Sequence, residues 1–291
     1  MIVADFRIIS LVGAENCRIH DRGLLRGFEL DVYIPSKGIA FEYDGLYWHS
    51  EAKKDDQLYH VKKTLACKEK GVRLIHVFED EWVNKNEICK SRISSVLGLD
   101  NKRIYARKCI VKEIQANEAN KFISENHIQG ISYGKYNYGL FNDGELVSVM
   151  TFCGLRRNLG GKKEEGCYEL LRFCNKLNTT VIGGAGKLFN RFIKDISPQK
   201  VISYADKRWS CGDLYYKLGF EYIHDSKPNY FYLVNGERRN RFNFRKDVLV
   251  REYGCPNEMS EKEFCRMNGW YRIYDCGSMK FEYIENKNTS K

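Results

Sequence analysis

Short apolar runs alternate with amphipathic stretches over the first hundred residues, a pattern typical of a mixed α/β unit. Residues 3–11 predict a helix. Residues 28–34 and 39–43 predict two strands, and the turn at 35–38, which contains proline and glycine, joins them as an antiparallel hairpin.

The same unit continues with alternating helices and strands. The elements predicted next are a helix at 57–70, a buried strand at 72–78 and a helix at 87–99. The first of these helices should pack through Leu58, Val61 and Leu65, which share one side. The unit then ends near residues 101–103.

The rest of the chain predicts a second, larger mixed sheet. Its elements are strands at 104–112, 136–141, 146–152, 168–174 and 201–205, helices at 116–125, 183–194 and 213–218, and a strand that begins at Phe220. A smaller C-terminal part has a helix at 261–267 and a strand at 271–274. The predicted fold class is therefore α/β (α+β), in three parts. These parts are residues 1–101, 102–245 and 246–291.

Charge indicates a polyanionic partner. The 291 residues include 48 Lys and Arg against 38 Asp and Glu, which gives a net charge of +10. Clustered basic side chains bind nucleic acid by releasing counterions from its phosphates, so nucleic acid is the predicted partner and a solvated basic surface is the alternative. No apolar run approaches the roughly 20 residues that span a bilayer, so no membrane partner is expected.

Cysteine usage bears on the cellular compartment. The 11 cysteines are scattered singly without a CxxC pair, which favours reduced thiols in the cytoplasm over a disulfide scaffold. A zinc site at Cys255, Cys265 and Cys276 is an alternative, but these residues lack the paired spacing of zinc ribbons. The favoured interpretation is that they are small buried hydrophobic side chains.

Three carboxylates fall on the predicted hairpin. Side chains alternate along a strand, so the hairpin can bring Asp31 on its first strand close to Glu42 and Asp44 on its second. Carboxylates this close repel one another unless a cation lies between them. Mg²⁺ prefers such oxygen ligands and is the predicted ion, with Mn²⁺ as a substitute. The alternative is that the acids point into solvent from a half-exposed hairpin.

Two histidines and a lysine extend this acidic group. Trp48 and His49 follow directly after the second strand, so His49 is a candidate general acid or base. His60 and Lys63 lie one turn apart on the following helix, and both can point at the hairpin if the helix packs against it.

The segments GFELDVYIPSKGIAFEYDGLYWHSE and YHVKKTLACKEKGVRLIHVFEDEW resemble the Vsr-like branch of the PD-(D/E)XK nuclease superfamily, and within it the phage-borne homing endonucleases. This resemblance covers about residues 1–100 and implies a PD-(D/E)XK nuclease core. It places Asp31 at the metal-binding aspartate, Glu42 and Asp44 at the second motif, and His49 at the histidine after the tryptophan. The superfamily usually has a lysine at the position of Asp44, so proton transfer would depend on His49, His60 or Lys63.

The chemistry that this resemblance implies is hydrolysis of a DNA phosphodiester bond. Its metal ligands would be Asp31, Glu42, Asp44 and the carbonyl oxygen of Tyr43. The metal would polarise the phosphate and activate a water molecule, while Asp44 or His49 moves protons. Lys63 would offset the charge that develops on the phosphate.

A second resemblance covers the larger sheet. Residues 181–189, with the glycine loop GGAG, and residues 213–220, DLYYKLGF, resemble the N-acetyltransferase-like (GNAT) fold. A glycine loop at a helix N-terminus can bind a pyrophosphate through its backbone N–H groups. Acetyltransferases usually open this loop with Gln or Arg, where this chain has Val181, so binding of coenzyme A stays open.

Basic residues interleaved with aromatic ones form the predicted DNA-binding surface, since such mixtures grip phosphates and stack on bases. Its candidate residues are Trp48, Lys207, Arg208, Trp209, Arg238, Arg239, Arg241 and Arg245. The alternative is a strand with a basic solvent face and with Phe242 and Phe244 in the core.

The function predicted from these features is a magnesium-dependent endonuclease of double-stranded DNA, cytoplasmic in a bacterial host if phage-encoded, in which residues 102–245 help to recognise the target. A homodimer is compatible with the sequence but not indicated by it. One alternative is a DNA base-modifying GNAT-type acyltransferase that resembles the phage Mom protein. Another is a non-catalytic DNA-binding regulator, which would bind DNA without Mg²⁺ and would not cleave it.

Overall fold

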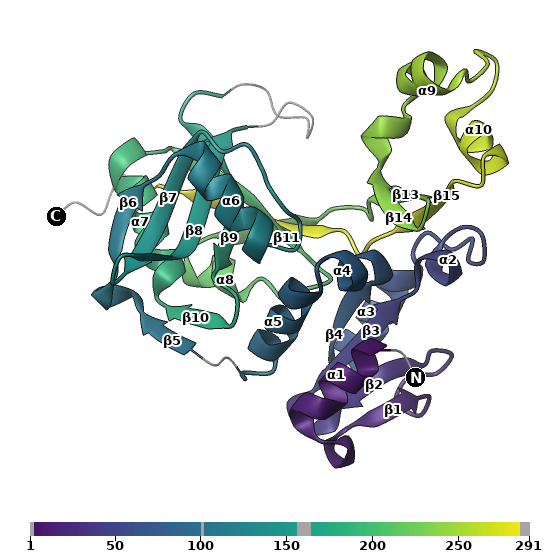
Figure 1. The fold of residues 1–291 in the computed structure, drawn as a ribbon, viewed down its shortest axis with the longest axis horizontal. Coiled ribbons are helices and arrows are strands. Elements are labelled where there is room, and N and C mark those ends of the chain that lie inside the picture. Colours follow the sequence, from purple (N-terminus) through teal and green to yellow (C-terminus); the bar gives the residue numbers. More distant parts are fainter. Residues whose placement is uncertain (1–2, 100–101, 156–163, 286–291) are drawn as a thin grey trace. The chain divides into compact units, whose positions relative to one another are not determined.

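The computed structural model describes residues 3–99, 102–155 and 164–285, which form two compact units (Figure 1). Neither unit is one continuous stretch of sequence. Unit 1 comprises residues 1–86, 206–209 and 227–278, and unit 2 comprises residues 87–205, 210–226 and 279–291. The three predicted parts of the chain differ from these units, because late segments complete the first one. Residue 101 of the predicted boundary lies outside the described residues.

Unit 1 contains a four-stranded sheet with the strand order β1-β2-β3-β4 (Figure 1). Its N-terminal elements are α1 (Val3–Val12), β1 (Arg18–Asp21), β2 (Leu30–Ile34), β3 (Ile39–Asp44), α2 (Leu46–His49), α3 (Tyr59–Glu69), β4 (Arg73–Phe78) and α4 (Glu79–Asn84). The predicted antiparallel hairpin is confirmed as β2 and β3, and β3 pairs with β4 in parallel. Strand β1 was not predicted because its sequence, RIHD, has no alternating apolar pattern.

The turn between β2 and β3 depends on its glycine. Gly38 has a φ of 60°, in the left-handed region, after the short 3-10 turn Pro35–Lys37. A Cβ atom at Gly38 would lie 3.3 Å from the backbone oxygen of Gly71. The turn therefore favours glycine for both its backbone conformation and its close packing.

Helix α3 packs through a different face from the predicted one. Leu58 and Leu65 are 46% and 45% exposed, so the predicted apolar side lies largely in solvent. The buried positions are His60, Lys63 and Cys67, which repeat at helical spacing and face the sheet. The prediction was wrong because the carboxylates on β3 provide polar partners for His60 and Lys63, which therefore become buried.

A second, smaller sheet of unit 1 comes from the C-terminal quarter of the chain. Its elements are β13 (Tyr230–Val234), β14 (Glu237–Asn240), α9 (Lys246–Tyr253), α10 (Glu261–Met267) and β15 (Tyr271–Tyr274), with the strand order β14-β13-β15. The predicted helix at 261–267 and strand at 271–274 are confirmed as α10 and β15. Cys255 and Cys265 lie with Phe244 in an apolar cluster, as expected for buried thiols.

Unit 2 contains a seven-stranded mixed sheet with the strand order β12-β16-β11-β9-β8-β7-β6. Its strands are β5 (Lys102–Tyr105), β6 (Ile110–Glu113), β7 (Tyr136–Asn142), β8 (Glu145–Gly154), β9 (Cys167–Asn175), β10 (Thr179–Ile182), β11 (Lys200–Asp206), β12 (Glu221–Asp225) and β16 (Ser278–Ile284). Its helices are α5 (Asn86–Val96), α6 (Ala116–Asn126), α7 (Gly184–Ile196) and α8 (Asp213–Lys217).

The strand predicted at 104–112 is two strands in the structure. A 3-10 turn at Ala106–Lys108 separates β5 from β6. Strand β6 forms the edge of the large sheet. Strand β5 is not part of that sheet and pairs in parallel with β10. The interruption matters because it places Arg107 beside the strand that leads into α7.

Helices α6 and α7 cover opposite faces of the large sheet (Figure 1). Helix α6 packs on Val149, while α7 packs on the following residue, Met150, because neighbours on a strand face opposite ways. On the α7 side, the rings of Phe152 and Phe192 stack with their centroids 3.7 Å apart. No helix of the described ranges is long and apolar enough to cross a membrane.

Candidate functional site

The predicted carboxylates of unit 1 are tied into the hairpin by hydrogen bonds. The backbone N–H of Asp31 donates to Oε1 of Glu42 at 3.0 Å, and the N–H of Tyr43 donates to Oδ2 of Asp31 at 2.8 Å. The ammonium group of Lys63 pairs with Oε2 of Glu42. Burial lowers the pKa of Lys63 to about 8. The charge of Glu42 is thus met by a lysine of α3, as expected if this helix packs against the hairpin.

Asp44 lies in a separate group, surrounded by imidazole rings. Its Oδ1 is 3.3 Å from Nδ1 of His49 and 3.4 Å from Nε2 of His60, and its Oδ2 is 3.0 Å from Nδ1 of His76. Burial alone would raise the pKa of Asp44, but the three imidazoles, first among them that of His60, hold it well below its usual range. Burial lowers the pKa of His49 to about 4, so its ring is neutral at pH 7.

Sequence reasoning missed His76, which is fully buried on β4. Its neighbours on both sides are apolar, a pattern that predicts a core strand. A histidine inside such a run was the available signal, because a buried polar ring requires hydrogen-bond partners. Here the partners are Asp44 and the hydroxyl group of Thr64, 3.0 Å from Nε2.

The structure therefore divides the predicted site into two neighbouring groups, one around Glu42 and one around Asp44. Among the residues that the structure describes, the side chains whose ligand atoms lie close enough together for a metal ion include two sets of three. These sets are Asp44, His60 and His76, and His20, Glu29 and Asp31. Neither set joins Asp31 to Glu42 or Asp44, so the acids do not form the single cluster that was expected.

Three of the predicted DNA-binding residues are buried ion-pair or core residues of unit 1. The guanidinium group of Arg208 pairs with Glu81 at 2.9 Å, and that of Arg238 pairs with the same carboxylate at 2.8 Å. Arg238 also stacks on the ring of Phe78. Trp209 is only 2% exposed. These three side chains hold the late segments of the chain in unit 1, and their burial leaves no surface for DNA.

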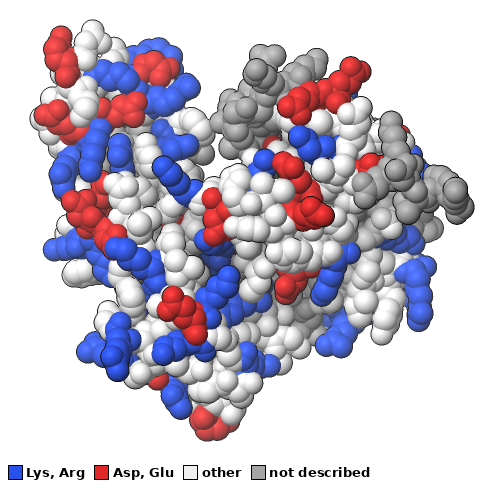
Figure 2. Space-filling view, turned by 180° about the vertical axis from the view of Figure 1, so that it is seen from behind, with Lys and Arg blue, Asp and Glu red and all other residues white. Residues whose placement is uncertain are grey.

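The other predicted DNA contacts have side chains that solvent reaches, and they stay a prediction. Trp48 is 64% exposed, and Arg239 and Arg245 form surface ion pairs with acidic neighbours. Arg241 is exposed and Lys207 is half-buried. Figure 2 shows lysine and arginine side chains interspersed with acidic ones over the visible face.

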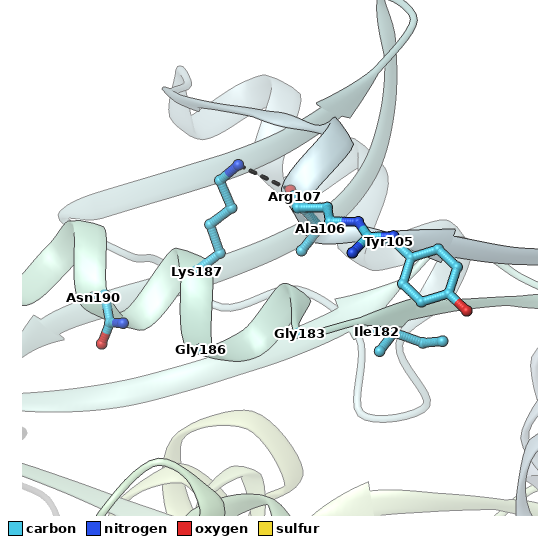
Figure 3. Close-up of a pocket in the computed structure, with 8 residues that line it drawn as sticks. All are labelled: Tyr105, Ala106, Arg107, Ile182, Gly183, Gly186, Lys187 and Asn190. Atoms are coloured by element: carbon cyan, nitrogen blue, oxygen red, sulfur yellow. Dashed lines mark hydrogen bonds between the residues drawn. The ribbon is translucent and has the colours of Figure 1, made fainter.

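The glycine loop of unit 2 borders a cavity of about 530 Å³ at the N-terminus of α7 (Figure 3). Its lining residues are Tyr105, Ala106, Arg107, Ile182, Gly183, Gly186, Lys187 and Asn190. The ammonium group of Lys187 donates to the carbonyl oxygens of Ala106 and Cys109, which ties α7 to the segment between β5 and β6. Sequence reasoning found the loop but missed Tyr105 and Arg107, which are far from it in sequence.

Backbone geometry leaves the first turn of α7 open on the side of this cavity. Gly183 precedes the helix with a φ of 77°, in the left-handed region. A Cβ atom at Gly186 would lie more than 4 Å from every described atom outside its own helix backbone and its two chain neighbours. Arg107 is exposed, and its guanidinium carbon lies 5.1 Å from the ring centroid of Tyr105. The helix terminus and one cation thus border an open space that can accept an anionic group.

The comparison with protein families finds a match that lies mostly in unit 2. The family model that matches is described as the Mom protein family, over residues 108–284. No curated protein matches the chain.

Similar solved structures are acetyltransferases, each at low identity. A Bacillus subtilis acetyltransferase in complex with CoA is 13% identical and has a TM-score of 0.35, with 62% of this chain and 99% of that chain covered. The ribosomal-protein-S18-alanine N-acetyltransferase of Escherichia coli is 9% identical, with a TM-score of 0.36 and coverage of 63% and 99%. A GNAT family acetyltransferase from Elizabethkingia anophelis with acetyl-CoA bound is 12% identical, with a TM-score of 0.35 and coverage of 61% and 99%.

The predicted endonuclease is wrong, because the family that matches is Mom and its matched residues begin only after the nuclease-like segments. The predicted hydrolase class is wrong for the same reason. The predicted Mg²⁺ or Mn²⁺ cofactor is corrected with it, because that ion was expected only as part of the nuclease. In this chain, moreover, hydrogen bonds and Lys63 already engage Asp31 and Glu42.

The residues that match the family model cover most of unit 2 and part of unit 1. Residues 108–284 include the large sheet from β6 to β16, both helices that cover it and the loop that opens α7. They also include the late segments that complete unit 1. Because the match spans well over half of the sequence, the chain belongs to the Mom protein family.

Proposed function

We propose that this protein transfers an acyl group from a coenzyme A thioester to a base in DNA. Membership of the Mom family over residues 108–284 is the observation that carries the proposal. This stretch contains most of the cavity at α7, and the chemistry of that cavity suits the pyrophosphate of coenzyme A.

The N-terminus of α7 supplies the anion site in this proposal. Its first backbone N–H groups have no partners within the helix, and the helix dipole favours negative charge at this end. The open space beside Gly186 lets a phosphate approach the backbone closely. Arg107 supplies a positive charge from the neighbouring segment, where the loop itself begins with the buried, uncharged Val181.

The transfer step has a simple balance. An exocyclic amino nitrogen of a base attacks the thioester carbonyl carbon, so a C–N bond forms and the C–S bond breaks. The sulfur leaves with the electron pair of the broken bond, and the proton that the amine loses passes to the thiolate or to solvent. Holding both reactants on one protein supplies the proximity that this step needs.

The net charge of +10 supports DNA as the second substrate. A base in a duplex must leave the stack before its amino group can reach a thioester in an enzyme pocket. Arg239, Arg241 and Arg245 of unit 1 are exposed cations that could bind DNA phosphates.

Calorimetric titration of the full chain with acetyl-CoA tests the cofactor. The parent protein should bind, and Gly186→Asp should bind at least tenfold more weakly, because its carboxylate would face the pyrophosphate. Gly186→Ala is the matched control and should bind like the parent, since its methyl group enters open space. The coenzyme site would be refuted if the parent did not bind acetyl-CoA, or if Gly186→Asp bound it equally well.

Mass spectrometry of nucleosides tests the DNA substrate separately. DNA incubated with the protein and acetyl-CoA should yield a nucleoside that is heavier by one acetyl group, and Gly186→Asp should reduce its amount. Coenzyme binding without any modified nucleoside would show that the acceptor is not DNA.

A further inference from the structure

We propose that Asp44, His49 and His60 of unit 1 form a binding site for one transition-metal ion of the Zn²⁺ or Co²⁺ type. This site lies outside the residues that match the Mom family, and it differs from the oxygen-rich magnesium site expected from the sequence. It does not depend on the proposed acyl transfer.

The first observation is the spacing of the three ligand atoms. Oδ1 of Asp44 is 3.3 Å from Nδ1 of His49 and 3.4 Å from Nε2 of His60, and the two ring nitrogens are 2.9 Å apart. Zinc binds nitrogen and carboxylate oxygen at about 2.0–2.1 Å, so two ligands of a tetrahedral ion lie about 3.3 Å apart. The three atoms thus nearly form one face of such a tetrahedron.

The second observation is an unpartnered oxygen. Asp44 is fully buried, and among the described residues its Oδ1 has no hydrogen-bond donor, although it faces the two histidines. A buried carboxylate oxygen without a donor costs free energy, and a bound ion is one of the few features that compensate for it.

Neighbouring groups orient the ligands in the way that metal sites usually require. Nδ1 of His60 lies 2.7 Å from the carbonyl oxygen of Tyr274, so it carries the proton and leaves Nε2 free to bind. Nδ1 of His76 lies 3.0 Å from Oδ2 of Asp44 and holds the carboxylate with Oδ1 turned toward the other two ligands. His76 is therefore a positioning residue, and Tyr274 fixes the tautomer.

Metal binding requires one rearrangement. In the free site, Nδ1–H of His49 donates to Nε2 of His60, and the planes of the two rings are nearly parallel. When a metal enters, this proton leaves Nδ1 and solvent returns a proton to Nε2 of His49, so no net proton is released. The ring can turn because its side chain is 14% exposed, and that opening leaves a fourth position for water. Two histidines and one carboxylate suit zinc, cobalt or iron rather than magnesium.

Titration of the chelator-treated full chain with Co²⁺, followed by visible absorption, tests the site. We expect one equivalent to bind with the spectrum of a nitrogen and oxygen site, without a thiolate-to-cobalt band, and Zn²⁺ to displace it. His49→Ala should weaken binding at least tenfold, and it should fold because His49 is the most exposed of the ligands. Asp44→Asn keeps the shape of the side chain but removes its charge, and it should also weaken Co²⁺ binding at least tenfold.

His224→Ala and His20→Ala are the controls. His224 is an exposed histidine of unit 2, and His20 belongs to the other set of ligand side chains. Both should bind Co²⁺ like the parent. The proposal is overturned if the parent binds no Co²⁺, if His49→Ala binds it unchanged, if His20→Ala abolishes binding, or if the spectrum shows thiolate ligands.

Discussion

Glu81 is the residue whose removal should most clearly destabilise unit 1. It is buried, and its carboxylate accepts from both Arg208 and Arg238. Burial alone would raise the pKa of Glu81, but the two arginines hold it at about 2. Against a usual value of 4.5, this shift corresponds to about 3 kcal/mol in favour of the folded state at neutral pH.

Glu81→Gln should therefore lower the free energy of unfolding by about 3 kcal/mol at pH 7, within the range for breaking a buried ion pair. Urea unfolding followed by tryptophan fluorescence measures this loss selectively, because all four tryptophans, Trp48, Trp82, Trp209 and Trp270, belong to unit 1. Glu237→Gln is the matched control. It removes a half-exposed carboxylate that pairs with Arg239, and it should cost less than about 1 kcal/mol.

The pH dependence has a definite sign. Because the pKa of Glu81 is lower in the folded state, its contribution is complete above about pH 4.5 and is lost as the pH falls toward 2. The difference in stability between the parent and Glu81→Gln should shrink over this interval. Equal stability of Glu81→Gln and Glu237→Gln at pH 7 would refute the argument, as would a difference that does not change with pH.

Three other substitutions test the packing described above. Gly38→Ala should cost about 1–2 kcal/mol, since φ is 60° and the new methyl group would lie 3.3 Å from the oxygen of Gly71; a lower urea midpoint in tryptophan fluorescence would reveal it. Phe192→Ala should cost about 3–5 kcal/mol, because it removes a fully buried ring stacked on Phe152; circular dichroism during urea unfolding measures it, and a cost below 1 kcal/mol would contradict that packing. Leu65→Ser should change the free energy of unfolding by less than about 0.5 kcal/mol, because this side of α3 is in solvent. A large loss of stability would instead support the buried apolar face that the sequence predicts.

Much of the local structure could be predicted from residue patterns. The hairpin β2–β3 followed from alternation around a turn with proline and glycine, and α10 followed from helical spacing. The face of α3 could not be predicted in this way. Its buried side carries His60 and Lys63, and only the carboxylates of a strand distant in sequence explain why polar side chains turn inward.

The candidate sites show the same limit. Alternation on the hairpin correctly put Asp31 beside Glu42, but it could not separate them from Asp44, whose partners include His76 on another strand. The basic pattern around Arg208 and Arg238 suggested a DNA surface, although these arginines neutralise Glu81 inside unit 1. Composition indicates how many cations a chain has, whereas only tertiary contacts decide which of them reach solvent.

The discontinuity of unit 1 has a consequence during synthesis on the ribosome. Glu81 is made 127 residues before Arg208, and at typical rates of translation this separation lasts roughly 6 to 25 s. Throughout that time, the nascent β4 and α4 lack the cations that neutralise Glu81 in the finished protein. His60 lacks its hydrogen-bond partner for longer still, because the carbonyl oxygen that fixes its tautomer belongs to Tyr274. The first segment to leave the ribosome is thus among the last to reach its final structure, and a fragment that ends near residue 101 would lack the partners on which its own buried polar groups depend.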